Sequence, residues 1–280
     1  MSTGKFMAEQ LEAQITGTIF AGGVHCFEQI DSTNMAAMRA GAEKYGISAG
    51  SNHHQPVDSR RAGELWLAEE QTAGKGRSGH GWESQCGLGI YMSVLARPRV
   101  EPSDAILLSL AAGLAVSDAV REVTAISCDL RWPNDVVLGS RKLCGILTEL
   151  SAEVARVRYV VIGLGLNVNQ RQFPPALEAI ATSLRIESGR DFDRLELTAA
   201  LLLALDHELA EFDHQPSGWK QNLLRRFEDA STYCQGAAVT VEEYGGYQGI
   251  TRGLDERGFL RVETSEAMRT VLSGGVRKRS

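Results

Sequence analysis

The segment that most constrains the fold is a glycine-rich, basic stretch that separates two apolar runs. It reads Gln71-Thr-Ala-Gly-Lys-Gly-Arg-Ser-Gly-His-Gly-Trp82, and no acidic residue interrupts it. Residues 64–70 and 87–96 have the apolar density of strands, so the stretch is expected to be a loop between two strands. Its glycines let the backbone approach a ligand closely and its basic residues supply positive charge, which together suit a phosphate or a carboxylate.

Residues 74–79 match the G-x-G-x-x-G spacing of dinucleotide-binding folds, but their context argues against an oxidoreductase of that kind. That motif must open a helix inside a strand–helix–strand unit, whereas the residues after Gly79 carry more glycines and lead into a strand. A P-loop is also excluded, because Lys75 is followed by Gly76 rather than by Ser or Thr. A flexible surface loop is the remaining structural alternative.

Composition describes a soluble globular protein of about two domains. The 280 residues are 43% hydrophobic and 23% charged, and the net charge of −6 argues against a general affinity for nucleic acid. Five widely spaced cysteines without a C-x-x-C pair indicate reduced thiols rather than zinc or a redox couple. The first residues lack a signal-peptide core and the longest apolar runs are too short to cross a bilayer, so we expect a cytoplasmic protein without a membrane partner.

Apolar periodicity predicts an α+β catalytic domain over residues 1–232, a mixed or antiparallel sheet packed with helices. A polar cap, Asp31-Ser-Thr33, follows a strand and precedes a helix, and Ser103-Asp104 is expected to cap the most regular helix. The predicted strands are 24–30, 126–132, 136–138, 143–150 and 159–166, and the predicted later helices are 194–212 and 219–227.

Residues 233–280 predict a second domain, a small all-β barrel with strands at 237–243, 248–254, 258–263 and 268–272. At the other end, residues 1–23 are too short for a helix-turn-helix unit, so no DNA partner is expected. Residues 47–63 predict a polar surface loop, in which His53 and His54 are more typical of solvated side chains than of metal ligands.

Three further motifs carry polar residues at strand ends. Arg131-Trp-Pro-Asn-Asp135 predicts an extended Trp132 followed by a turn at Asn134-Asp135. Lys142-Leu-Cys-Gly145 and Gly163-Leu-Gly-Leu-Asn167 place glycines inside apolar strands, where another group can approach the backbone. Each of them alone is compatible with ordinary turns and strands.

Taken together, the motifs resemble those of the biotin protein ligases in both order and spacing. The matching segments are Asp31-Ser-Thr-Asn34, Glu70-Gln-Thr-Ala-Gly-Lys-Gly-Arg77, Trp132-Pro-Asn-Asp135, Lys142-Leu-Cys-Gly-Ile-Leu147 and Gly163-Leu-Gly-Leu-Asn167. The resemblance runs from about Val24 to the C-terminus, where Gly275-Val-Arg277 is similar to the end of the family's SH3-like barrel. It implies a class II synthetase-like catalytic domain followed by that barrel.

The resemblance implies a two-step reaction at one site. The carboxylate of biotin attacks the α-phosphate of ATP to give biotinyl-5′-AMP and pyrophosphate, and a lysine of a biotin carboxyl carrier protein then attacks the mixed anhydride. Adenylation brings two anions together, so fixed cations must offset their repulsion. The implied catalytic residues are Lys75, Arg77 and Lys142.

It also implies two ligand subsites. Biotin would be bound by Ser32, Thr33, Asn34, Gln71, Lys75, Gly76, Arg77, Lys142 and Gly145. ATP and the adenylate would be bound by Arg77, Trp82, Asn134, Asp135, Lys142 and Asn167, with Mg2+ near Asp135 and Asn167.

Two departures from the family pattern shape further expectations. At Lys75 and at residues 78–81 family members usually carry more arginine, so this loop is expected to order less readily without ligand and to hold the acyl-adenylate less tightly. No match to the DNA-binding domain of the bifunctional members precedes Val24, so the resemblance is to the monofunctional class. It leaves the oligomeric state, with a homodimer as one option, and the identity of the carrier undetermined.

Two other functions stay open at this point. A lipoate-type acyl ligase on a related fold should lack the loop at residues 74–82 and the terminal barrel. A non-catalytic regulator that binds biotin or its adenylate would not need Arg77 and Lys142. No Ser/His or Cys/His pair points to covalent catalysis, and Cys144 is more typical of a core residue than of a nucleophile.

Overall fold

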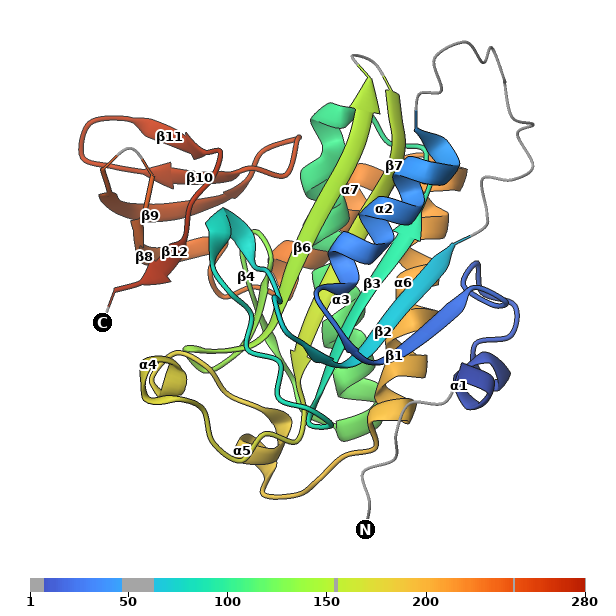
Figure 1. The fold of residues 1–280 in the computed structure, drawn as a ribbon. Coiled ribbons are helices and arrows are strands. Elements are labelled where there is room, and N and C mark those ends of the chain that lie inside the picture. The colour runs from blue at the N-terminus through green and yellow to red at the C-terminus, as the bar shows by residue number, and fades with distance from the viewer. Residues whose placement is uncertain (1–7, 47–62, 154–155, 244, 280) are drawn as a thin grey trace.

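The computed structural model consists of a large sheet covered by helices and a smaller C-terminal sheet beside it (Figure 1). It describes residues 8–46, 63–153, 156–243 and 245–279. The predicted loop at 47–63, with His53 and His54, lies outside the described residues except for Gly63.

The large sheet has seven strands in the order β1-β2-β3-β7-β6-β5-β4. Its strands are β1 (Val24–Ile30), β2 (Glu64–Gln71), β3 (Gly89–Ala96), β4 (Asp129–Arg131), β5 (Asp135–Leu138), β6 (Arg141–Glu153) and β7 (Arg156–Asn167). β1 and β2 are parallel and the remaining pairs are antiparallel, which confirms the predicted mixed sheet. A parallel pair needs a crossover connection, and α2 (Thr33–Tyr45) lies within it.

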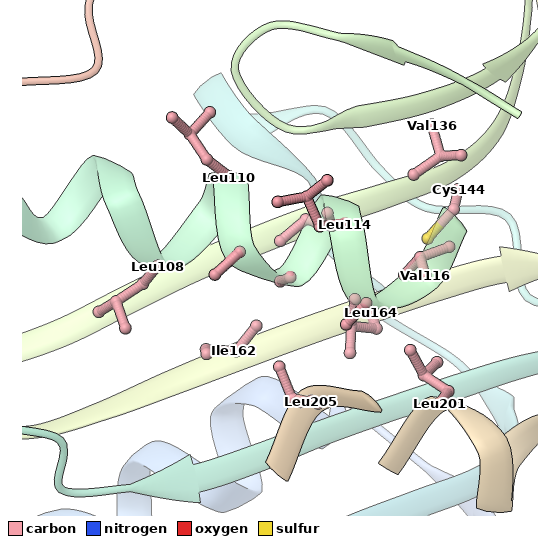
Figure 2. Close-up of a cluster of buried hydrophobic side chains, with 14 of the residues drawn as sticks. Leu108, Leu110, Leu114, Val116, Val136, Cys144, Ile162, Leu164, Leu201 and Leu205 are labelled. Carbon is pink, nitrogen blue, oxygen red and sulfur yellow. The ribbon is translucent and has the colours of Figure 1, made fainter. Parts of the chain in front are cut away.

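Helices cover both faces of this sheet. α2 packs on β2, β3 and β7, and α3 (Ala105–Thr124) lies on the opposite face with α6 (Arg194–His214) and α7 (Trp219–Asp229). Figure 2 shows the core on the α3 and α6 side of the sheet, where leucines of these two helices gather near Ile162 and Leu164 of β7. Residues 102–124 are long and apolar enough to cross a membrane, but they are mostly buried, so α3 is the core helix that its periodicity predicts.

The two predicted caps have different outcomes. The side chain of Ser32 caps α2 by accepting a hydrogen bond from the backbone N of Met35 at 3.5 Å. Asp104 stands at the start of α3 but makes no side-chain cap bond, because its carboxylate pairs with Lys220 at 2.5 Å instead. The expected capping role of Asp104 is therefore wrong, and this carboxylate ties α7 to α3.

The turn between β4 and β5 differs from its prediction. Residues 132–134 form the turn, with a cis peptide between Trp132 and Pro133, and Asp135 already belongs to β5. The predicted turn at Asn134-Asp135 was therefore displaced along the chain. Because Asp135 pairs in register with Arg131, the two side chains stand side by side at the edge of the sheet.

The C-terminal segment forms a five-stranded antiparallel sheet in the order β11-β10-β9-β8-β12, as an SH3-like domain requires. Its strands are β8 (Gln235–Val241), β9 (Tyr247–Leu254), β10 (Leu260–Glu263), β11 (Met268–Val271) and β12 (Val276–Lys278). One hydrophobic cluster continues from α3 into this sheet, and the indole nitrogen of Trp132 donates to the carbonyl oxygen of Gly258 at 2.9 Å. These contacts bring β12 close to the turn between β4 and β5.

Three short helices complete the chain. α1 (Ala8–Gln14) packs against α6 and β1. α4 (Pro175–Glu178) and α5 (Leu184–Ser188) follow β7 and were not predicted. They matter for function, because the segment around α4 borders the site described next.

Candidate active site

The loop at residues 71–82 lies over the middle of the large sheet, where two glycines face each other. Gly145 on β6 and Gly165 on β7 are register partners, and the indole of Trp82 occupies the space above both of them. A Cβ on Gly165 would lie 2.4 Å from the indole Cε2, and one on Gly145 would lie 2.8 Å from Cζ3. The mid-strand glycines therefore admit a side chain from the loop, as their sequence pattern predicted.

The loop is folded back on itself. Lys75 and Gly81 form an isolated antiparallel bridge, and the backbone N of Gly76 donates to the carbonyl oxygen of His80 at 2.7 Å. Gly79 turns the chain with a φ of +78°, a conformation that side chains with a Cβ rarely adopt. This closed form presents Lys75 and Arg77 toward the sheet, where both line one cavity.

Four charged groups converge beside the loop. Asp135 is paired through one carboxylate oxygen with Lys142 at 2.6 Å and through the other with Arg131 at 2.8 Å. Arg77 donates from Nη1 to the side-chain oxygen of Asn134 at 2.9 Å, and Asn134 is itself held by a bond from its Nδ2 to the backbone of β6. Three cations thus surround one carboxylate, which leaves positive charge for an anionic ligand.

Burial and neighbouring charge set the protonation of this cluster. Burial acts to raise the pKa of Asp135, but Lys142 and Arg131 outweigh it, so the pKa of this carboxyl lies below its usual range. Burial lowers the pKa of Arg77, and the charge of Asp135 opposes that shift. A guanidinium starts from so high a pKa that Arg77 remains a cation at neutral pH.

A narrow cavity between α2, the loop and the sheet is lined by all nine residues that were expected to bind biotin. They are Ser32, Thr33, Asn34, Gln71, Lys75, Gly76, Arg77, Lys142 and Gly145. Thr33 donates from its backbone N to the side-chain oxygen of Gln71 at 2.9 Å, and Gln71 donates from Nε2 to Ser84 at 3.2 Å. Met92, Ile146 and Leu164 supply apolar walls, so the cavity combines donors and acceptors with an apolar slot.

A second cavity opens on the other side of Trp82 and Lys142. Asp135, Asn167 and Arg277 line its polar side, while Phe173, Leu177 and Ile180 from the α4 segment form an apolar side. Two backbone hydrogen bonds hold this segment to Lys142: Lys142 N donates to Ile180 O at 2.8 Å and Thr182 N donates to Lys142 O at 2.9 Å. Sequence reasoning missed this apolar wall.

The residues proposed for the adenine side surround Trp82 and Lys142. Asp135 and Asn167 line the second cavity with these two residues, and Arg77, Asn134 and Asp135 line a neighbouring cleft with them. Asn167 is 3% exposed, and its amide donates to the carbonyl oxygen of Thr182 at 3.0 Å and accepts from Gln170 at 3.3 Å. Its side chain supports the cavity wall, with both polar atoms already bonded within the protein.

The same contacts test the expected magnesium site. A magnesium ion prefers oxygen ligands that are free to coordinate it. Both oxygens of Asp135 are held by cations, and the amide oxygen of Asn167 accepts from Gln170. No group of three or more His, Cys, Asp or Glu side chains suited to a metal occurs among the described residues. Asp135 and Asn167 thus do not fit the role of magnesium ligands.

Cys144 behaves as the core residue that the sequence indicated. It is fully buried behind Lys142, and burial raises the pKa of its thiol far above the usual range. A thiol that stays protonated and lies out of reach is no nucleophile.

Arg277 on β12 was not proposed as a site residue. It lines the second cavity and also a cleft formed by the loop, the β4–β5 turn and the C-terminal sheet. Its Nε is 2.8 Å from a carboxylate oxygen of Glu242, and both side chains are more than half exposed. The signal for Arg277 was the terminal Gly275-Val-Arg277 motif, whose position in space only the packing of the C-terminal sheet defines.

Comparison with known proteins agrees with this geometry. Residues 48–167 match the model of the biotin/lipoate A/B protein ligase family. The chain is 35% identical over 229 residues to the bifunctional ligase/repressor BirA of Bacillus subtilis, a match that covers 80% of this chain and 69% of that protein. It is 36% identical over 222 residues to the biotin–acetyl-CoA-carboxylase ligase of Mycobacterium tuberculosis, covering 76% and 78% respectively.

The fold comparison leads to the same group of proteins. The solved structure of a biotin protein ligase from Aquifex aeolicus in complex with biotin and ATP has a TM-score of 0.71 to this chain. The two are 30% identical, and the match covers 92% of this chain and 99% of that one. With its sequence relatives, its fold and its motifs in agreement, the chain belongs to the biotin/lipoate A/B protein ligase family, among the biotin protein ligases.

Proposed function

We propose that this chain activates biotin with ATP to biotinyl-5′-AMP and then transfers biotin to a lysine of a biotin carboxyl carrier protein. The observation that carries the proposal is that Trp82 and Lys142 line both cavities. A carboxylate that enters from the polar cavity and a phosphate that enters from the apolar one therefore meet at the same cation. That is the encounter which adenylation requires.

The first step uses the cations at this junction. A carboxylate oxygen of biotin forms a bond to the α-phosphorus of ATP, and the bond from that phosphorus to the pyrophosphate oxygen breaks. Lys142 and Arg77 stabilise the charge that develops at phosphorus, and Lys75 adds charge from the rim of the loop. Asp135 and Asn134 hold Lys142 and Arg77 in place before the ligands meet.

In the second step the amine of the carrier lysine attacks the acyl carbon, the bond from that carbon to the AMP oxygen breaks, and the nitrogen releases a proton to water as the amide forms. Released AMP keeps the phosphate that Lys142 and Arg77 stabilise, so the same cations serve both steps. Charge placement carries the mechanism, without a covalent intermediate on the protein. Magnesium would accompany the nucleotide phosphates and offset part of their charge.

The apolar wall of the α4 segment suits the adenine ring. Phe173, Leu177 and Ile180 are apolar residues that line the same cavity as Trp82, and Ile180 is 46% exposed. An exposed apolar side chain at the mouth of a cavity gains free energy when a ring covers it. Adenine thus binds between Trp82 and the α4 segment.

Location and partners follow from the same proposal. The described cysteines are free thiols, and thiols stay reduced in the cytoplasm, so we place the protein and its carrier there. The carrier is a carboxylase domain, and DNA and membranes are not partners. A homodimer is compatible with this function but is not required by the site.

One assay tests the proposal. The chain is incubated with ATP, Mg2+, biotin and a carrier domain, and the carrier is weighed by mass spectrometry. A gain equal to one biotinyl group supports the proposal, whereas a gain only with lipoate overturns it. Lipoate has no specific support in the structure, since the loop at 74–82 and the C-terminal sheet are both present. Biotin binding without any adenylate or transfer would indicate the regulator instead.

A further inference from the structure

A chain of four hydrogen-bonded polar side chains runs from Thr33, Asn34 and Ser93, which line the biotin cavity, to Glu149 outside it. Asn34 donates from Nδ2 to a carboxylate oxygen of Glu149 on β6 at 2.7 Å. Its Oδ1 lies 2.6 Å from the hydroxyl of Ser93 on β3, and that hydroxyl lies 2.8 Å from the hydroxyl of Thr33. Thr33, Asn34 and Ser93 are each at most 4% exposed, so these bonds form away from water.

The geometry around Asn34 is constrained from behind. A Cβ on Gly163 would lie 2.0 Å from the Oδ1 of Asn34, so the amide occupies space that only a glycine leaves free. Its Nδ2 also lies 3.4 Å from the carbonyl oxygen of Leu147, a second acceptor on the same side. The amide is therefore wedged between β6 and β7 in one orientation.

The acceptors on the Glu149 side of Asn34 determine which atom donates in each of the following hydrogen bonds. A carboxylate only accepts hydrogen bonds, so Glu149 requires the NH2 group of Asn34 and turns Oδ1 toward Ser93. An amide oxygen also only accepts, so Ser93 gives its single hydroxyl hydrogen to Asn34 at 2.6 Å and cannot also donate it to Thr33, which lies 2.8 Å away. The hydroxyl hydrogen of Thr33 is engaged by the Oε1 of Gln71 at 3.1 Å in any case. The direction of the hydrogen bonds therefore decides whether Ser93 donates to Thr33 and occupies one of the lone pairs of its hydroxyl oxygen.

We propose that Glu149 is a positioning residue that, by directing the Ser93 hydrogen to Asn34, keeps the lone pairs of the Thr33 hydroxyl free to accept a hydrogen bond from an N–H of the ligand. A cyclic urea offers such N–H donors, whereas a dithiolane ring such as that of lipoate offers none. Glu149 thereby selects biotin against lipoate through Asn34 and Ser93, without touching the ligand. The inference rests on the proposed function and adds a residue that determines its specificity.

Glu149 is well placed for a test, because it is exposed to solvent. A single hydrogen bond from an exposed carboxylate contributes little to the free energy of unfolding, so its substitution leaves the fold intact. A purely structural role would change the melting temperature, whereas a positioning role changes biotin affinity.

The experiment compares Glu149→Gln, Glu149→Ala and Glu149→Lys in the full chain by calorimetric titration with biotin. Glu149→Gln can still accept from Asn34 and should bind within about twofold of the wild type. Glu149→Ala should weaken biotin binding about fivefold, and Glu149→Lys, which only donates and so reverses the chain, at least about tenfold. The KM for ATP should stay unchanged in all three.

A matched control comes from the same strand. Glu153→Ala removes an equal charge from β6, but Glu153 pairs with Arg158 rather than with Asn34, so biotin affinity should not change. A Ser93→Ala background adds a second check, because Ser93 transmits the effect: Glu149→Lys should cost little further affinity there.

The outcomes separate this inference from the proposed function. If the wild type does not biotinylate the carrier, the function itself fails. If the wild type is active and the three Glu149 variants bind biotin equally, or Glu149→Gln is as weak as Glu149→Lys, the positioning role is overturned. Full additivity of Ser93→Ala and Glu149→Lys would likewise overturn it.

Discussion

Trp82 lies so close to Gly165 that a Cβ on this glycine would come 2.4 Å from the indole Cε2. The contact couples the loop to the centre of the sheet, and through Lys142, 5.4 Å from the indole ring centre, to the cation cluster. The absence of one side chain on β7 is thus a condition for the loop to close over both cavities.

Gly165→Ala should therefore displace Trp82 and open the loop. Overpacking of this kind costs about 1–3 kcal/mol, so we expect carrier biotinylation to fall about tenfold or more. The measurement is the biotinylation rate together with indole fluorescence. Gly113→Ala on α3 is the control, because its nearest neighbour would be 3.6 Å away, and it should keep full activity. Equal rates for both variants would remove Trp82 from the closed site.

Arg77→Ala should separate the two half-reactions. Removing a cation that stabilises developing charge typically costs about a hundredfold in rate, so adenylate formation should slow or the adenylate should escape. Pyrophosphate release and carrier labelling, measured in parallel, distinguish these results. Arg121→Ala, an exposed arginine paired with Asp118, is the control. An unchanged rate with folded protein would exclude Arg77 from the site.

The sequence predicted those parts of the site that lie in continuous motifs. The nine residues expected to bind biotin line one cavity, because the start of α2, the end of β2, the loop after it and the first residues of β6 meet there. The apolar wall at Phe173 and Ile180 could not be predicted, since α4 is only four residues long and has no detectable period. Its role depends on backbone bonds to Lys142, a contact between segments far apart in the sequence.

The limits on the fold have similar causes. Most residues of the strands that have seven residues or more were predicted as strand, whereas β12, which has three residues, was not predicted. The turn before Asp135 shows how strand register shapes the site. Because the turn ends one residue earlier than predicted, Asp135 belongs to β5 and is the register partner of Arg131 on β4. Glu149 could not be predicted as a site residue, because an acidic residue on an exposed strand position is common. Its hydrogen bond to Asn34 depends on the packing of α2 against the sheet.

Arg277 offers a test of the C-terminal domain. Because Arg277 lines the second cavity and pairs with the half-exposed Glu242, Arg277→Ala should raise the KM for ATP about threefold to tenfold and leave biotin affinity unchanged. Lys278→Ala is the matched control, since the Nζ of Lys278 instead lies over Tyr233 at 4.3 Å. A rise in the dissociation constant for biotin would contradict this assignment.

Hydrogen exchange tests the expectation that the loop orders less readily without ligand. The amides of Gly76, His80 and Trp82 are bonded only within the loop, so they should exchange quickly without ligand and slow when biotinyl-5′-AMP binds. Amides of β7 serve as the internal reference. Slow exchange of the loop in the ligand-free protein would contradict the expectation.

Asp135 links the site to pH. Its pKa is lowered in the folded state, since Lys142 and Arg131 outweigh the effect of burial, so the carboxylate stabilises the fold above its ordinary pKa of about 4. That contribution is lost as pH falls through the lower folded pKa. Asp135→Asn should therefore reduce the melting temperature at pH 7, and the difference from the wild type should shrink below about pH 4. Asp118→Asn, an exposed carboxylate on α3, is the control. A difference for Asp135→Asn that stays constant from pH 7 to pH 3 would mean that its charge does not hold the cluster together.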